Sequence, residues 1–168
     1  MTGLQSAPNS TGSGKAAQAD SPAPDFTLPD GSGKSVHFMD LVGKSEIVLF
    51  FYPQDNSAGC TMEACAFRDS YEAFKDVGAE VIGISPDSAD SHQAFSAKHR
   101  LPFILLSDQG EQVAKRYGVA KRLGIFPGRV TYIIDRRGIV RHIFSSLVPT
   151  QHVADALKAI QALREEHV

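Results

Sequence analysis

Apolar residues along the chain fall into short runs separated by turn residues, and this pattern predicts alternating strands and helices. The longest apolar run lies within residues 46–52 and ends at Pro53, which is typical of a central strand buried on both faces. From Cys60 the apolar spacing changes to three and four residues, which predicts a helix that ends near Gly78. Later in the chain the pattern predicts strands at 81–84 and 103–106, a hairpin of 130–134 with 139–144, and helices at 89–99, at 111–117 and from Thr150.

The order of these elements predicts the fold class. Two short apolar pieces, 26–28 and 36–38, flank a glycine-rich loop and predict an N-terminal β-hairpin. Strands that alternate with helices imply an α/β domain with a central mixed sheet flanked by helices. A β-α-β unit followed by a terminal β-β-α is the order of a thioredoxin-like fold. Residues 1–20 lack periodicity and are expected to form a disordered tail, so the domain is expected to cover residues 21–168.

Composition and charge exclude several classes of protein. A chain of 168 residues suits one domain, and its net charge of -2 excludes a broadly basic nucleic-acid binder. Its apolar runs are far shorter than the roughly 18–20 residues that span a bilayer, so no membrane partner is expected. Residues 1–20 lack the charged start and apolar stretch of a secretory signal, which favours a soluble cytoplasmic protein. Their Ser and Thr content and scarce acids leave plastid targeting as the alternative.

Candidate chemistry lies where the strand at 46–52 passes into the next helix. The chain has two cysteines, too few for a disulfide scaffold, so their function is expected to be redox or catalytic. Cys60 falls in the first helical turn, where the helix dipole and unpaired N–H groups favour an anion, and this makes it a candidate nucleophile. Ser57 precedes the helix as an N-cap or as a ligand of the site, and these roles are compatible. The alternative for Cys60 is a small buried apolar residue.

The residues around this cysteine resemble a known signature. Pro53, Ser57 and Cys60 stand as Pro-xxx-Ser-xx-Cys, which resembles the peroxiredoxin pattern Pro-xxx-Thr/Ser-xx-Cys. The string Gly59-Cys60-Thr61-Met62-Glu63-Ala64-Cys65-Ala66-Phe67-Arg68-Asp69 is similar to the PrxQ, or bacterioferritin-comigratory, branch of peroxiredoxins. Ala58 departs from this branch, which usually has proline at that position, and the difference concerns the stiffness of the loop. The similarity continues at Gly83-Ile84-Ser85, Leu106-Ser107-Asp108 and Pro127-Gly128-Arg129.

The resemblance implies a thiol-specific peroxidase that reduces hydrogen peroxide and organic hydroperoxides. Cys60 would attack the peroxide, while Arg129 would point at its sulfur and, with Ser57, hold the peroxide oxygens. Pro53 would shield the site from water. Glu63 lies on the inward side of the helix, where an acidic group needs a partner. The resemblance implies that Glu63 orients the arginine, and the alternative is a first-turn glutamate that serves the helix dipole.

Cys65 is implied as the resolving cysteine. Residues five apart in an ideal helix have Cα atoms about 8.6 Å apart, beyond the roughly 7 Å that disulfides bridge. We therefore expect the first turns after Cys60 to unwind when the disulfide forms. The alternative is that Cys65 is only packed and another thiol resolves. The resemblance implies thioredoxin or a similar dithiol as reductant, a monomeric protein, and no metal or organic cofactor.

Two other functions fit the same residues. A protein thiol–disulfide oxidoreductase of the same fold would normally show Cys-xx-Cys, so the longer spacing from Cys60 to Cys65 argues against it. A redox-responsive interaction protein would be oxidised once and reduced slowly, whereas an enzyme would consume peroxide catalytically.

The six histidines have no metal-ligand spacing, and His92 and His99 are predicted to share a solvated helix face.

Overall fold

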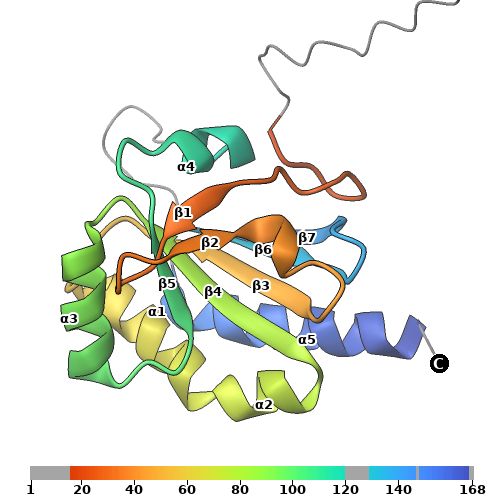
Figure 1. Ribbon diagram of the computed structural model, residues 1–168. Helices are drawn as coiled ribbons and strands as arrows, with labels where there is room; N and C mark the ends of the chain where they lie inside the picture. Colours follow the sequence, from red (N-terminus) through yellow and green to blue (C-terminus); the bar gives the residue numbers. More distant parts are fainter. Residues whose placement is uncertain (1–15, 120–128, 147, 167–168) are drawn as a thin grey trace, which may run out of the picture.

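The structure is a computed structural model that describes residues 16–119, 129–146 and 148–166 (Figure 1). It is a mixed α/β fold, as predicted, because each apolar run has the period of the element it forms. The strands are β1 (Thr27–Pro29), β2 (Ser35–His37), β3 (Glu46–Phe51), β4 (Ala79–Ser85), β5 (Ile104–Ser107), β6 (Val130–Ile134) and β7 (Val140–Ser145). The helices are the short 3-10 helix η1 (Phe38–Asp40), α1 (Ala58–Asp69), α2 (Tyr71–Asp76), α3 (Ala89–His99), α4 (Gln112–Tyr117) and α5 (Pro149–Glu166).

The main sheet runs in the order β5-β4-β3-β6-β7. β3, β4 and β5 are parallel, while β6 is antiparallel to both β3 and β7. Every residue of β3 is buried, which confirms the central strand predicted from the apolar run. The N-terminal hairpin of β1 and β2 is also confirmed, as a separate small sheet.

Helices cover both faces of this sheet (Figure 1). On one face, α1, α2, α3 and α5 bury a core that includes Phe50, Phe67 and Ile160. On the other face, α4, η1 and the N-terminal hairpin bury a second core that includes Phe38 and Tyr117. Among the described residues, no helix combines the length and the apolarity that crossing a membrane requires.

The prediction of one helix from Cys60 to near Gly78 is wrong in one respect, because this segment forms two helices, α1 and α2. α1 ends at Asp69, the backbone of its C-cap residue Ser70 (φ -101°, ψ 4°) leaves the helical region, and α2 then starts at Tyr71. Serine favours such a break because its hydroxyl competes with the helical hydrogen bonds. The apolar stripe continues across the break, since Phe67 and Phe74 are both fully buried.

The segment expected as a tail partly belongs to the packed structure. Residues 1–15 lie outside the described residues. The backbone N–H of Ala17 donates to Tyr117 O at 3.2 Å, and that of Asp20 donates to Val140 O at 2.6 Å. The packed part of the chain therefore begins before residue 21, and the proposed division into a tail and one domain stays a prediction.

Candidate active site

Cys60 lies in the first turn of α1, just beyond the end of β3. Ser57 is the N-cap of this helix, and its Oγ accepts a hydrogen bond from the Cys60 N–H at 3.3 Å. The cap occupies one of the helix-end donors and fixes the turn that carries the cysteine. The thiol is 1% exposed and free. It is thus a buried cysteine at the positive end of a helix dipole.

Arg129 approaches this cysteine from a segment that lies 69 residues later in the chain. It precedes β6, and because Phe51 of β3 pairs with Val130, the sheet register sets Arg129 beside the loop that follows β3. Its Nη2 lies 3.3 Å from the Cys60 Sγ, and its side chain is 12% exposed. Burial acts to lower the pKa of Arg129, but Glu63 and Cys60 outweigh it and raise that pKa above its ordinary value. A guanidinium at this distance stabilises a thiolate relative to a thiol.

Glu63 lies one turn further along α1 and is fully buried. Its Oε2 is 3.2 Å from Nη1 of Arg129, so the arginine bridges the carboxylate and the sulfur. The ion pair between Glu63 and Arg129 lacks good hydrogen-bond geometry, since neither Glu63 oxygen accepts a hydrogen bond from the described residues. Burial raises the pKa of Glu63 to about 7, although the charge of Arg129 pulls it down.

His152 of α5 lies behind Glu63. Its Nε2 is 2.8 Å from the Ser146 carbonyl oxygen and 4.0 Å from Glu63 Oε2, while its Nδ1 lies 2.8 Å from Thr131 Oγ1. Burial lowers the pKa of His152, and the charge of Arg129 lowers it further, which favours a neutral ring. A neutral ring with Nε2–H donating to Ser146 leaves Nδ1 to accept from Thr131. Arg129 is therefore the cation that faces Glu63.

The raised pKa of Glu63 predicts how stability depends on pH. A carboxyl group that titrates at about 7 in the fold and near 4.5 when unfolded contributes stability that is complete below pH 4.5 and is lost as the pH rises through 7. The loss accrues at about 1.4 kcal/mol per pH unit between the two pKa values, so from pH 5 to pH 8 it amounts to about 2.5 kcal/mol. Glu63→Gln cannot ionise, so the variant is expected to lack this loss. Urea unfolding of the reduced protein at both pH values measures the difference.

The control for this measurement is Glu72→Gln, which removes an exposed glutamate from the first turn of α2. We expect it to keep the pH dependence of the wild type. Parallel stability curves for wild type and Glu63→Gln would contradict the raised pKa.

Cys65 and Pro53 take positions around this centre without contacting the sulfur of Cys60 in any described hydrogen bond. Pro53 is half-buried in the loop directly after β3 and Tyr52. Cys65 lies on the intact α1, is half-buried and carries a free thiol. Its Sγ faces α3, where it lies 3.8 Å from Nδ1 of His99. The structure thus brings Ser57, Glu63 and Arg129 to Cys60 and turns Cys65 towards a different helix.

The prediction that His92 lies on a solvated face is wrong. His92 is fully buried, because the inward face of α3 carries His92 and Phe95 one turn apart. Its Nδ1 lies 2.8 Å from Oδ2 of Asp55, and its Nε2 lies 3.0 Å from the Leu106 carbonyl oxygen. Asp55 belongs to the loop that leads to Cys60. Although burial acts to raise the pKa of Asp55, hydrogen bonds from His92 and Tyr52 lower it.

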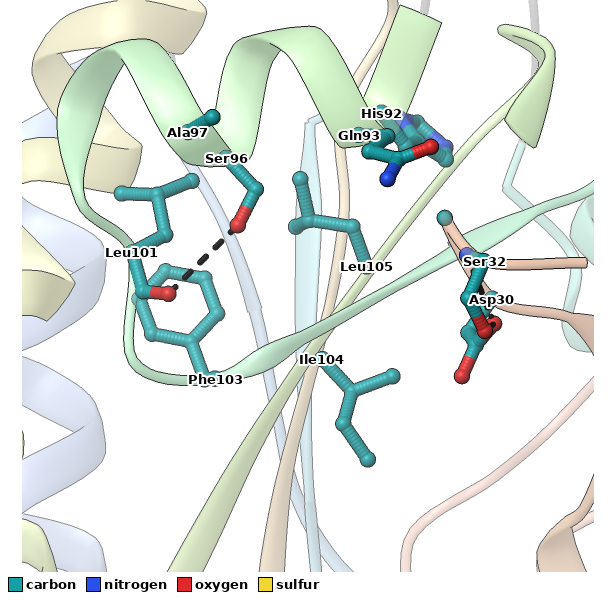
Figure 2. Close-up of a pocket in the computed structure, with 11 residues that line it drawn as sticks. Asp30, Ser32, His92, Gln93, Ser96, Ala97, Leu101, Phe103, Ile104 and Leu105 are labelled. Atoms are coloured by element: carbon teal, nitrogen blue, oxygen red, sulfur yellow. Dashed lines mark hydrogen bonds between the residues drawn. The ribbon is translucent and has the colours of Figure 1, made fainter. Parts of the chain in front are cut away.

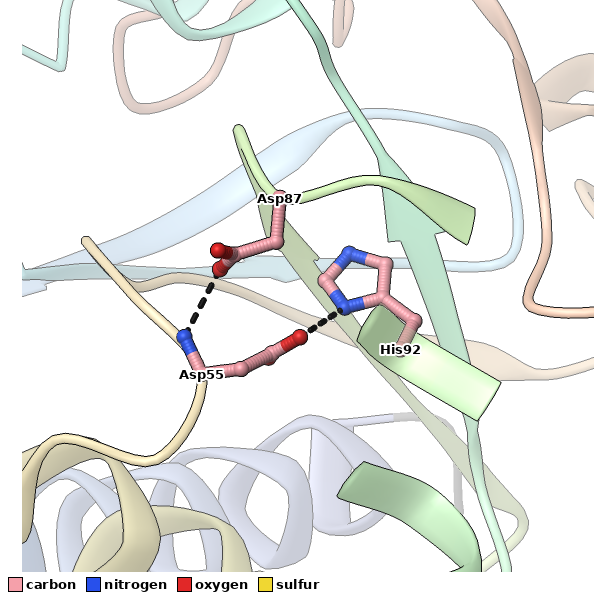
Figure 3. A group of neighbouring side chains, drawn as sticks. All are labelled: Asp55, Asp87 and His92. Atoms are coloured by element: carbon pink, nitrogen blue, oxygen red, sulfur yellow. Dashed lines mark hydrogen bonds and ion pairs between the residues drawn. The ribbon is translucent and has the colours of Figure 1, made fainter. Parts of the chain in front are cut away.

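Asp87 completes this cluster, which Figure 3 shows. Ligand-capable atoms of Asp55, Asp87 and His92 lie within 4.8 Å of one another. They already have partners, because Asp87 Oδ2 accepts from the Asp55 N–H at 2.7 Å and from Ser85 Oγ at 2.8 Å. The cluster therefore fastens the Cys60 loop to α3. One feature of the sequence could have predicted that these side chains meet: Asp55 and Asp87 each follow one of two neighbouring parallel strands.

A hollow of about 430 Å³ lies between α3, β5 and the turn of the N-terminal hairpin (Figure 2). Its two titratable side chains are already engaged, since Asp30 accepts from the N–H groups of Ser32 and Lys34, and His92 bonds Asp55. Neither Cys60 nor Arg129 is among the described residues that line it. Among the described residues, the hollow is therefore separate from the Cys60 site.

Comparison with known proteins agrees with this geometry. The AhpC/TSA family matches residues 19–143 of the chain. A wheat (Triticum aestivum) protein named peroxiredoxin Q, chloroplastic, is 51% identical over 152 residues, which cover 89% of this chain and 69% of the relative. A protein of the same name from Sedum lineare is 49% identical over 84% of this chain and 76% of its own length. The chain spans about two thirds of the length of several such relatives.

Solved structures are similar as well. Peroxidoxin BcpB of Mycobacterium tuberculosis superposes with a TM-score of 0.81 at 35% identity, over 87% of this chain and 97% of that one. Peroxiredoxin Q of Xanthomonas campestris gives a TM-score of 0.77 at 28% identity, over 82% of this chain and 90% of that one. These proteins confirm the thioredoxin-like architecture predicted from the order of elements. The chain therefore belongs to the AhpC/TSA family, and within this family it is a peroxiredoxin of the Q type.

Proposed function

We propose that this thiol peroxidase reduces hydrogen peroxide and organic hydroperoxides at Cys60, resolves the product with Cys65 and is reduced again by thioredoxin or a similar dithiol protein. One observation carries the proposal: the Cys60 sulfur lies in the first turn of α1, 3.3 Å from the Arg129 guanidinium. A helix end and a fixed cation both stabilise the thiolate, which is the nucleophilic form of cysteine.

In the first step the Cys60 thiolate attacks the terminal peroxide oxygen. An S–O bond forms, the O–O bond breaks, and water or an alcohol leaves after taking up a proton. Arg129 donates hydrogen bonds to the oxygens as charge develops on them, and Ser57 holds the turn in place. Glu63 keeps Arg129 in position, with Oε2 3.2 Å from Nη1, and Pro53 shields the site from water. Cys60 is left as a sulfenic acid. Because sulfur carries both electrons, this step needs no metal or organic cofactor.

In the second step the Cys65 sulfur attacks the sulfenic acid and a Cys60–Cys65 disulfide forms. Both residues belong to the continuous α1, where positions five apart lie about 8.6 Å apart at Cα. A disulfide cannot bridge this distance, so the first turns must open. An intramolecular bond needs no second chain, which supports a monomer as the working unit. Sedimentation of the reduced and oxidised protein tests this point.

We expect the opening of α1 to be measurable by amide hydrogen exchange. Residues 60–66 should exchange faster in the oxidised protein than in the reduced protein, because the disulfide is incompatible with their helical hydrogen bonds. Residues 89–99 of α3 serve as the internal control and should exchange alike in both states. Equal exchange at 60–66 in the two states would contradict the unwinding.

Peroxide turnover with a thioredoxin system tests the function as a whole. The enzyme should consume many equivalents of peroxide per chain while thioredoxin is available. Consumption of a single equivalent, followed by slow reduction, would instead indicate a redox-responsive interaction protein. Reduction of protein disulfides such as those of insulin, without peroxide consumption, would indicate a thiol–disulfide oxidoreductase.

The compartment is proposed on sequence grounds as the cytoplasm, with the plastid as the alternative. Relatives from wheat and Sedum lineare are named chloroplastic, which supports the plastid alternative. A fluorescent tag at the C-terminus of the full chain, expressed in plant cells, separates the two by where the fluorescence collects.

A further inference from the structure

We propose that His99 is the base that ionises Cys65 for the resolving step. The inference deepens the proposed function and rests on it, since it concerns the step in which Cys65 closes the disulfide. His99 belongs to α3, whereas Cys65 belongs to α1, so the two meet only through the packing of these helices.

The geometry pairs the two side chains directly. The Cys65 Sγ lies 3.8 Å from Nδ1 of His99, a separation at which the thiol S–H can donate a hydrogen bond to the ring nitrogen. Both residues are half-buried, so the contact is partly shielded from water. Phe95, one turn earlier on α3, packs edge-on against the His99 ring with centroids 5.0 Å apart and planes at 68°. This packing restricts the ring and keeps Nδ1 directed at the sulfur.

A helix end and a nearby cation surround the Cys65–His99 pair. His99 is the last residue of α3, so its ring lies at the negative end of the helix dipole. This end of the helix offsets the positive charge that the ring carries after it takes the Cys65 proton. Arg68 of α1 is a charged group that contacts His99, since its Nη1 donates to the His99 carbonyl oxygen, and Asp69 at 3.0 Å partly offsets its charge. Lys98 and Arg100 flank His99 in the sequence, but both are exposed to solvent. The cation of Arg68 thus lies on the side of α1 that carries Cys65, where positive charge favours a thiolate.

A second contact ties the same part of α1 to His99. Nη1 of Arg68 donates to the His99 carbonyl oxygen at 2.8 Å. Cys65 and Arg68 are three residues apart and share one side of α1, so both hold this side against the end of α3. No comparable described bond joins Cys60 to α3. We therefore expect the turn that carries Cys60 to unwind and move, while Cys65 stays beside its base.

The Cys65 thiol proton passes to Nδ1 of His99, and the resulting thiolate attacks the sulfur of the Cys60 sulfenic acid. The S–S bond forms as the S–O bond breaks, and hydroxide leaves and takes the proton from the imidazolium as water. The sulfenic sulfur is reduced and the Cys65 sulfur is oxidised, so no other oxidant or reductant is needed.

The test separates the two steps in His99→Asn, which keeps a polar side chain but cannot accept the proton. Rapid mixing with peroxide and quenching at set times gives the rate of sulfenic acid formation, by dimedone trapping, and the rate of disulfide formation, by mass spectrometry. We expect the first rate to stay within about 2-fold of wild type and the second to fall at least about 10-fold. Sulfinic acid at Cys60 should then accumulate at lower peroxide concentrations.

The pH profile identifies the base. Without the base, the rate of disulfide formation in His99→Asn should rise more steeply between pH 6 and pH 8 than the wild-type rate does. Lys98→Gln is the matched control, because it removes an exposed cation from the same helix end without touching Cys65. It should keep both rates and the wild-type profile.

Wild-type disulfide rates and pH profile in His99→Asn would overturn the role of His99. Should that variant fail to fold, His99→Gln decides by the same two rates. If the wild-type enzyme itself forms no sulfenic acid at Cys60, or no Cys60–Cys65 bond, then the proposed function fails, and with it the role of His99.

Discussion

Cys60→Ser is expected to abolish peroxide turnover, with a fall of at least about 10⁴-fold. A hydroxyl in the same turn of α1 does not ionise near neutral pH, and oxygen cannot be oxidised to a sulfenic acid. Arg129, 3.3 Å from the sulfur in the wild type, would then face a neutral group. Serine is close in size to cysteine, so the fold should persist. Thioredoxin-coupled consumption of hydrogen peroxide, together with circular dichroism of the variant, measures both expectations.

Cys65→Ser is the matched control, because it removes the other thiol from the same helix. The variant should still consume about one equivalent of peroxide and then stall, with Cys60 held as a sulfenic acid. Full turnover in Cys60→Ser would contradict the assignment of the nucleophile. Full turnover in Cys65→Ser would show instead that another thiol resolves the sulfenic acid.

Arg129→Gln is expected to slow the oxidation of Cys60 by about 10²–10³-fold. The substitution removes the cation that stabilises the thiolate and also the donors that hold the peroxide oxygens as charge builds on them. The second-order rate constant for loss of the Cys60 thiol, followed after rapid mixing with peroxide, measures the effect. The rate of the later disulfide step should change far less, because Cys65 faces α3 and not Arg129.

Loss of folding must be separated from loss of chemistry in this variant. Arg129→Gln leaves Glu63 buried without its cation, and breaking a buried pair by removing one partner costs about 3–5 kcal/mol. The double variant with Glu63→Gln removes both charges and should recover much of this stability. Its peroxide rate should remain low. Recovery of the rate along with the stability would show that Arg129 acts only through packing.

The sequence alone determined the features that depend on neighbours along the chain. The run of apolar residues predicted the buried β3, and the polar stretch after Pro86 predicted a helix near residues 89–99; the structure confirms both elements. Ser57 caps α1, as its place before the helix indicates, and Cys60 lies in the first turn. These features follow from local hydrogen-bond patterns and from the two side-chain periods of strands and helices, and a short window of residues contains both. The break at Ser70 escaped this reasoning because the apolar stripe passes through it unchanged.

Only the tertiary structure decided which of these features meet. Cys60 and Arg129 lie 69 positions apart, and the register of β3 with β6 brings them to 3.3 Å. Asp55 and His92 are 37 positions apart and are joined because β3 and β4 end side by side. His99 meets Cys65 because α3 packs against α1. Strand order and helix packing arise from burial summed over the whole chain, which no local pattern contains, so the burial of His92 and the partner of Cys65 became visible only in three dimensions.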